Sequence, residues 1–83
     1  MPYITKKRRP IYDRVVNEMK RVNVKANGDL NYILFAFCKR FVEPGYGNYK
    51  NFCGELRQCA TEIERKILAP YEDKKIEENG DVL

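Results

Sequence analysis

Three features of the sequence predict an all-α fold built from three helices. Apolar residues recur at steps of three and four along three segments, which is the repeat of a helix with one apolar face. Clusters of Gly, Pro and Asn separate these segments, as turns require. A length of 83 residues, 43% of them apolar and 34% charged, suits one small globular domain. We therefore expect a single helical domain over residues 1–83, with a basic arm at 1–9 and helices at 10–23, 30–42 and 48–79.

The first helix, residues 10–23, is predicted from an apolar stripe along one face. Pro10 suits the first turn of a helix, where its missing amide leaves no hydrogen bond unmade. Asn27 and Gly28 follow the stripe and are expected to supply a stop or turn. The stripe consists of Ile11, Val15, Met19 and Val22.

The second helix, residues 30–42, is unusual because it is apolar on nearly every side. Asp29 is a suitable N-cap for it. Only Asn31, Lys39 and Arg40 are clearly polar within it. Such a helix is normally buried on all sides, and its length of about 20 Å is too short to cross a bilayer. We therefore expect other protein surface to cover it.

The third helix, residues 48–79, follows a loop that is rich in Gly and Pro. Asn48 or Asn51 is expected to cap its start. Pro70 has no amide and its ring clashes with the preceding turn, so it predicts a kink in this long helix.

The second and third helices together predict a homo-oligomer. A helix over residues 48–79 would be nearly 50 Å long at about 1.5 Å per residue, whereas a domain of this size has a radius of gyration of about 12 Å. Such a helix would protrude and need a partner to pack on it. Association is a common way to stabilise small chains, because they bury a smaller share of their surface. The alternative is a compact three-helix monomer with a few exposed aromatic side chains.

The residue types that are missing exclude several kinds of active site. The chain has no His and no Ser, so neither a Ser/His/Asp triad nor a Cys/His pair can form within it. Cys38, Cys53 and Cys59 lack the close spacing of a structural zinc site and lie among apolar residues, where a free Cys packs as a small hydrophobe. No carboxyl group lies in the apolar setting that a general acid needs at neutral pH. We predict a protein that is not an enzyme and holds no metal or cofactor.

Positive charge is concentrated toward the amino-terminal end. Residues 1–25 hold eight basic and two acidic side chains, a net of +6, whereas residues 66–83 hold three basic and five acidic ones, a net of −2. The basic run at residues 6–9 is suited to nucleic acid, to an anionic ligand or to the acidic end of a neighbouring subunit, or it is simply solvated. The six Tyr add aromatic faces that can stack on bases.

The start of the sequence also bears on location. Its basic residues are followed by no apolar stretch, so no secretory signal is predicted, and no run of 18 or more apolar residues predicts a membrane span. We expect a cytoplasmic protein without a membrane partner.

A series of short signatures spans nearly the whole chain, beginning with the opening Met1-Pro2-Tyr3-Ile4. The others are Gly28-Asp29-Leu30-Asn31-Tyr32, Gly54-Glu55-Leu56, Pro70-Tyr71-Glu72 with Lys74 or Lys75, and Asn79-Gly80-Asp81-Val82. In their order and spacing they resemble a family of small uncharacterised proteins of bacteriophages and prophage-bearing bacteria. No activity is known for that family, so the resemblance implies a phage accessory protein in the host cytoplasm and no catalytic residue.

The resemblance favours a non-catalytic accessory protein that disables a component of host defence. In its sharpest form, we expect it to sequester an anionic nucleotide immune signal in pockets between subunits. Basic side chains would then bind phosphate, while Tyr and Asn side chains would contact the base. The expected ligand-binding residues are Arg8, Arg9, Asn31, Tyr32, Tyr71, Lys74 and Lys75.

Two alternatives stay open at this point. One is a basic nucleic-acid-binding accessory protein that uses residues 6–9 and the first helix, with binding that weakens steeply as salt rises. The other is a purely structural or protein-interaction module that uses only its oligomer surface and binds neither ligand.

Overall fold

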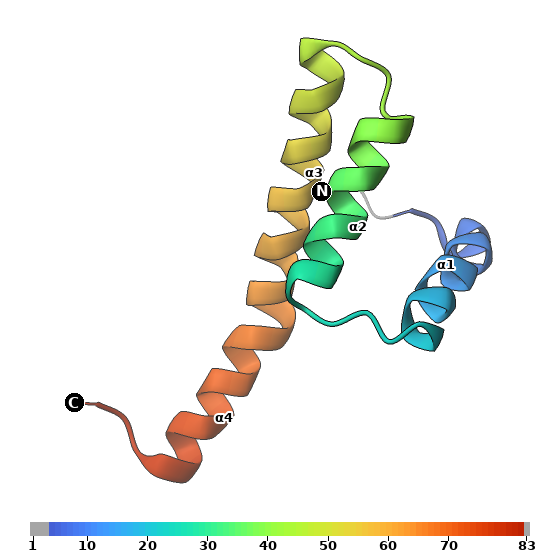
Figure 1. Cartoon of the computed structure of the whole chain (residues 1–83). Helices are drawn as coiled ribbons and strands as arrows, with labels where there is room; N and C mark the ends of the chain where they lie inside the picture. The colour runs from blue at the N-terminus through green and yellow to red at the C-terminus, as the bar shows by residue number, and fades with distance from the viewer. Residues whose placement is uncertain (1–3, 83) are drawn as a thin grey trace. The chain divides into compact units, whose positions relative to one another are not determined.

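A computed structural model describes residues 4–82, and every element in it is helical (Figure 1). In chain order the elements are the 3-10 helix η1 (Lys6–Arg8), α1 (Arg9–Arg21), α2 (Gly28–Phe41), α3 (Tyr46–Ile63), the π-helical turn η2 (Glu64–Leu68) and α4 (Ala69–Asn79). Because α3, η2 and α4 follow one another without a break, residues 4–82 form three long helical segments and no strand. The predicted all-α class with three helices is confirmed.

The helices belong to two compact units. The first unit ends at Val42 and holds η1, α1 and α2, while the second begins at Glu43 and holds α3, η2 and α4. The single domain over residues 1–83 and the homo-oligomer stay predictions.

The end of α1 is formed by a Schellman motif after Arg21. The amide of Asn23 donates to the carbonyl of Lys20 and the amide of Val24 donates to the carbonyl of Met19, both at 3.0 Å. This pair of bonds closes a helix when the residue after its C-cap is left-handed, and Asn23 has a φ of 61°. Asn adopts this conformation more readily than most residues, so the helix ends here.

The start of α2 is held by two side chains in roles that differ from those predicted. Asn27, expected with Gly28 to supply a stop or turn, lies in a turn and is also the N-cap of α2, where its Oδ1 accepts from the amide of Asp29 at 2.8 Å. Asp29, expected as the N-cap, already lies in the first helical turn, where its Oδ2 accepts from the amide of Lys25 at 3.3 Å. The N-cap prediction for Asp29 is wrong because Asn27, two residues earlier, already caps the helix.

Replacing Asn27 with Ala is expected to lower the free energy of unfolding by about 1 kcal/mol, because the Asp29 amide loses its acceptor. Urea denaturation followed by far-UV circular dichroism measures the change. Asn27→Asp keeps an acceptor and should restore most of the loss. Asn51→Ala, inside α3, is the matched control and should be neutral or slightly stabilising, since Ala favours helix. Equal losses from Asn27→Ala and Asn51→Ala would contradict the capping role.

The start of α3 has no capping side chain. Its N-cap is Gly45, so the predicted cap by Asn48 or Asn51 is wrong. Both Asn residues lie inside the helix, which begins at Tyr46. The Nδ2 of Asn48 donates back to the carbonyl of Glu43 at 3.0 Å and so joins the first turn to the preceding loop.

One wide turn, η2, interrupts the α-helical pattern of the long segment shortly before Pro70. The ribbon nevertheless runs on from α3 into α4 (Figure 1). There the amide of Ala69 donates to the carbonyl of Glu64, five residues earlier, whereas an α-helix pairs residues four apart. Pro70 has no amide to donate, and its ring crowds the carbonyl of Lys66, four residues before it. A wider turn gives that ring room. The helix therefore continues past Pro70, and the kink stays a prediction.

Neither unit has a buried side chain among residues 4–82. On α2 the rings of Tyr32, Phe35 and Phe41 are 65%, 68% and 73% exposed. Cover for residues 30–42 by other protein surface therefore stays a prediction. A half-buried stripe marks the inner face instead and consists of Leu30, Ile33, Leu34, Ala36 and Cys38.

Candidate ligand-binding site

The first unit carries two pairs in which an arginine lies against an exposed tyrosine. Nη2 of Arg8 donates to Oη of Tyr12 at 3.1 Å, and the guanidinium carbon of Arg8 is 5.9 Å from the centre of the Tyr12 ring. On α2, Nη2 of Arg40 donates to Oη of Tyr32 at 3.3 Å. All four side chains are exposed. Each pair therefore presents a planar cation and an aromatic face to solvent.

The second unit carries two similar pairs with lysine. Nζ of Lys75 lies 5.6 Å from the centre of the Tyr71 ring on α4 and 3.2 Å from a carboxylate oxygen of Glu78. Nζ of Lys50 lies 5.9 Å from the centre of the Tyr46 ring at the start of α3. Exposed cation–π contacts stabilise by about 0.5–1 kcal/mol, and surface ion pairs by no more. Such weak contacts leave the ammonium groups able to bind a stronger anionic partner.

The remaining predicted ligand-binding residues belong to none of these cation–tyrosine pairs. Nε of Arg9 donates to the carbonyl of Ile4 at 3.2 Å, which ties the segment before η1 to α1. Lys74 is exposed on α4. Asn31 faces a shallow hollow of about 330 Å³ on α2. The residues that line this hollow are Gly28, Asn31, Tyr32 and Phe35.

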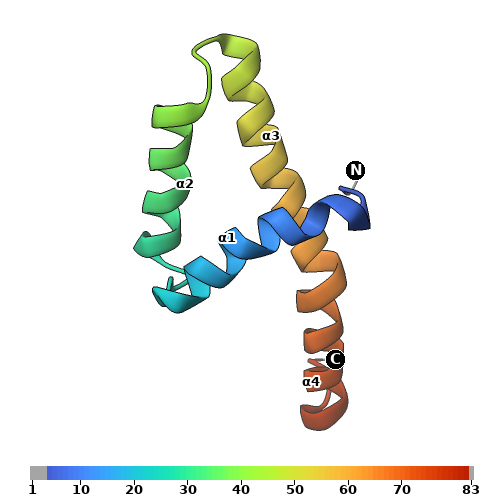
Figure 2. The same ribbon diagram turned by 90° about the vertical axis from the view of Figure 1, so that its right-hand side faces the viewer.

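The predicted ligand-binding residues form several small groups. Those of the first unit do not line one common pocket. Arg8 and Arg9 lie at the start of α1, Asn31 and Tyr32 near the start of α2, and Tyr71, Lys74 and Lys75 on α4. In the first unit, η1 lies at the end of α1 that is farther from α2 (Figure 2). With 13 residues, α1 is about 20 Å long. The two arginines are therefore too far along α1 to share a ligand with Asn31 and Tyr32.

Two partners of predicted residues, Tyr12 and Arg40, are missed by the sequence analysis. Arg8 and Tyr12 are four residues apart, the spacing at which side chains on a helix touch, so this spacing could have revealed the first pair. Arg40 is eight residues from Tyr32, and only its long side chain closes that distance. The first contact can be found from the sequence, whereas the second depends on a side-chain conformation.

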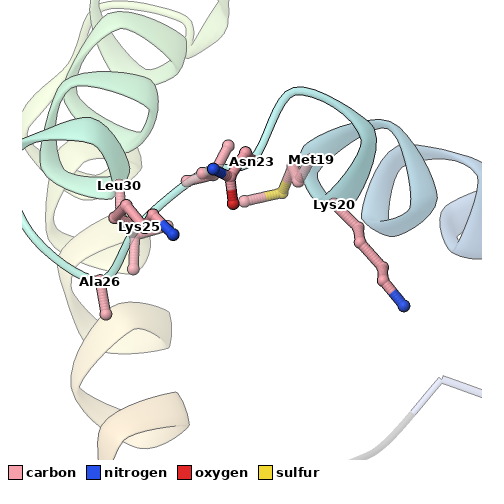
Figure 3. A pocket seen from close by; sticks show the side chains of 7 residues that line it. Met19, Lys20, Asn23, Lys25, Ala26 and Leu30 are labelled. Atoms are coloured by element: carbon pink, nitrogen blue, oxygen red, sulfur yellow. The ribbon is translucent and has the colours of Figure 1, made fainter.

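A second hollow, also missed, lies at the corner between α1 and α2 (Figure 3). Its volume is about 330 Å³. Figure 3 shows Met19 reaching toward Asn23, while Lys20 extends away from the other labelled side chains. The left-handed turn at Asn23 produces this corner. The lining residues are Met19, Lys20, Asn23, Val24, Lys25, Ala26 and Leu30.

Glu18 and Glu62 are engaged in surface ion pairs. Nε of Arg21 donates to Glu18 at 2.9 Å, and this hydrogen bond holds the pKa of the Glu18 carboxyl below its usual range. Glu18 in turn raises the pKa of Arg21. Glu62 accepts from Arg65 at 3.0 Å and lies 3.7 Å from the ammonium of Lys66. Across residues 4–82 no cluster of His, Cys, Asp and Glu has the arrangement to hold a metal ion.

The three cysteines are free thiols in different surroundings. Cys38 is half-buried on α2, as the predicted packing role requires. Cys53 and Cys59 are exposed on α3, so the same prediction is wrong for them. Among the helices that the structure describes, none combines the length and hydropathy of a membrane span.

Comparison with known proteins identifies the family of this chain. A domain of unknown function, DUF6899, matches residues 1–82. The chain belongs to the DUF6899 family. No curated protein and no solved structure matches it. The phage context of this DUF6899 protein stays a prediction.

Proposed function

We propose that this DUF6899 protein is a non-catalytic binding protein that holds an anionic, nucleotide-like ligand. The observation that supports this is the repeated placement of a cation beside a tyrosine side chain, against the ring in two pairs and on the hydroxyl in the third. Guanidinium and ammonium groups bind phosphate oxygens through charge-assisted hydrogen bonds, and a tyrosine ring stacks on a base. A nucleotide carries both chemical groups, so each pair offers a partner for both. The pairs at predicted ligand residues are Arg8–Tyr12, Arg40–Tyr32 and Lys75–Tyr71.

The proposed binding protein works as a homo-oligomer, with its ligand pockets between subunits. Within the first unit the arginines at the start of α1 do not reach Asn31 and Tyr32 on α2, so a pocket that uses both groups requires another copy. A second copy would also cover apolar side chains, none of which is buried in residues 4–82.

The resemblance to phage accessory proteins supplies the proposed setting. In the host cytoplasm, the protein would disable a component of host defence by sequestering a nucleotide immune signal. Sequestration requires tight binding and no bond cleavage, and a chain without His and Ser is suited to that task.

Thermal unfolding with cyclic dinucleotides, cyclic trinucleotides and ADP-ribose derivatives tests the proposal. A ligand at about a hundredfold excess over its Kd stabilises the folded state by about 2.7 kcal/mol, which for a chain of this size raises Tm by about 10 to 20 °C. Arg8→Ala and Lys75→Ala should each reduce the shift, because each removes a phosphate-binding cation from a predicted site. Lys50→Ala is the matched control, since it removes one positive charge from a cation–tyrosine pair outside the predicted set.

The possible outcomes separate the proposals. No shift across the panel contradicts nucleotide binding, and an equal reduction by Lys50→Ala shows that charge alone attracts the ligand. DNA or RNA binding that weakens steeply with salt, and that is lost when residues 6–9 become Ala, would support the nucleic-acid-binding alternative. If the protein binds neither a nucleotide nor a nucleic acid, the result would favour the structural or protein-interaction module.

A further inference from the structure

We infer that the apolar face of α1 is a self-pairing surface, on which α1 of a second copy of the chain docks in antiparallel orientation. The inference deepens the proposed function and rests on it, because it names one interface of the proposed homo-oligomer. The face, here called the α1 face, consists of Ile11, Tyr12, Val15, Val16, Met19 and Val22.

The α1 face is continuous and open. At about 100° per residue, its six side chains fall on one side of the helix and the charged side chains fall on the other. Met19 is half-buried at the corner with α2, and the other five side chains are between 45% and 66% exposed. A 13-residue helix is marginal in water unless an apolar face packs against something. The first unit does not provide that packing.

Charged residues along the two edges of the α1 face suit an antiparallel copy. Arg14 and Glu18 flank one edge, and Asp13 and Lys20 flank the other. In an antiparallel pair, each edge meets the same edge of the other helix. When the two helices cross near Val16, Arg14 faces Glu18 of the second copy, whose carboxylate also binds Arg21 of its own helix. Asp13 then faces Lys20 of the second copy. The two-fold axis repeats each of these attractive contacts.

In a parallel pair the two edges also meet with opposite charges, because Arg14 would lie beside Asp13 of the second copy and Glu18 beside Lys20 of the second copy. The difference lies at the η1 segments, Lys6–Arg8, which a parallel pair would bring side by side with like charge. In the antiparallel pair, the two η1 segments lie at opposite ends of a helix about 20 Å long, well beyond the Debye length of about 8 Å at physiological salt. The charge of the η1 segments therefore selects the antiparallel orientation.

The mixed charge of the edges also favours a second copy over an anionic surface. A membrane or nucleic acid that approached the α1 face would meet the carboxylates of Asp13 and Glu18 along with the basic groups. A copy of the same helix offers a cation to each of those carboxylates. The surface is thus self-complementary and only partly complementary to a uniformly negative partner.

Two charge-reversal variants test this pairing, measured by sedimentation velocity over a range of protein concentrations. In an Arg14→Glu homodimer, the introduced carboxylate would face Glu18 of the second copy, and in a Glu18→Arg homodimer, two guanidinium groups would face each other. Each variant alone should associate at least about tenfold more weakly than the wild type. An equimolar mixture restores opposite charges at both contacts and should associate within about twofold of the wild type. Arg57→Glu, on α3, makes the same change in net charge as Arg14→Glu and should associate as the wild type does.

The mixture also separates loss of pairing from loss of helix. If either substitution merely weakened α1, mixing the two variants would restore nothing, and far-UV circular dichroism of each would fall. A wild type that is monomeric at every concentration overturns the proposed assembly and this interface together. A wild type that assembles, with both variants unaffected or with no recovery on mixing, overturns this interface and leaves the proposed assembly standing.

Discussion

Replacing Pro70 with Ala is expected to raise the free energy of unfolding by about 1 to 3 kcal/mol. Pro70 lies inside the continuous helical segment from Tyr46 to Asn79, where proline is less favourable than Ala by about 3 kcal/mol. The wide turn η2 relieves part of that penalty by moving the backbone away from the ring. The substitution therefore recovers only the part of the penalty that remains. For a chain of this size the change raises Tm by at least about 4 °C.

The same substitution is expected to change the hydrogen bonding of η2. With an amide at position 70, the carbonyl of Lys66 gains a donor four residues on, and the amide of Ala69 can return from Glu64 to Arg65. Amide hydrogen exchange at residues 69 and 70 reports this change, and urea denaturation reports the stability. Pro44→Ala, in the loop before α3, is the matched control and should be neutral or slightly destabilising, because proline restricts the unfolded chain. A Pro70→Ala protein no more stable than Pro44→Ala would show that η2 relieves the strain completely.

Replacing Val16 with Lys is expected to weaken self-association by about a hundredfold or more. In the proposed α1 pair, Val16 lies where the two copies cross, so the two-fold axis brings both substituted side chains into the interface. Full burial of one Val side chain contributes about 1.5 kcal/mol or more, so two account for about 3 kcal/mol, and each buried ammonium adds a desolvation penalty. Sedimentation velocity over a concentration series measures the dissociation constant.

The isolated chain should tolerate Val16→Lys, because Val16 is 60% exposed and Lys favours helix more than Val does. Helix content at low protein concentration should therefore be unchanged. Asn17→Lys adds the same charge on the opposite side of α1 and should leave the dissociation constant within about threefold of the wild type. Equal weakening by both variants would mean that added charge, and not the α1 face, controls association.

The helices themselves can be predicted from the sequence because their signal is local. Ile11, Val15, Met19 and Val22 repeat at the spacing of one helix face, and this repeat requires no knowledge of the rest of the chain. The same spacing places Tyr12 one turn after Arg8, which is why that contact of the candidate site also follows from the sequence.

The helix ends between α1 and α2 are harder to predict because three similar side chains compete within seven residues. Asn23, Asn27 and Asp29 all have the short polar side chains that favour caps and turns. Their roles are assigned once Asn23 adopts a left-handed backbone, because that choice ends α1 and frees Asn27 to cap α2. Single-residue preferences differ too little among them to decide this order.

By itself, the sequence determined that the chain is helical and that its apolar and charged side chains fall on separate faces of α1, because both properties follow from spacing at 3.6 residues per turn. Only the tertiary structure decided that Asn23 adopts a left-handed backbone, that a wide turn carries the helix past Pro70, and that Arg40 reaches Tyr32. These features depend on individual backbone dihedral angles and side-chain conformations, which residue spacing leaves open.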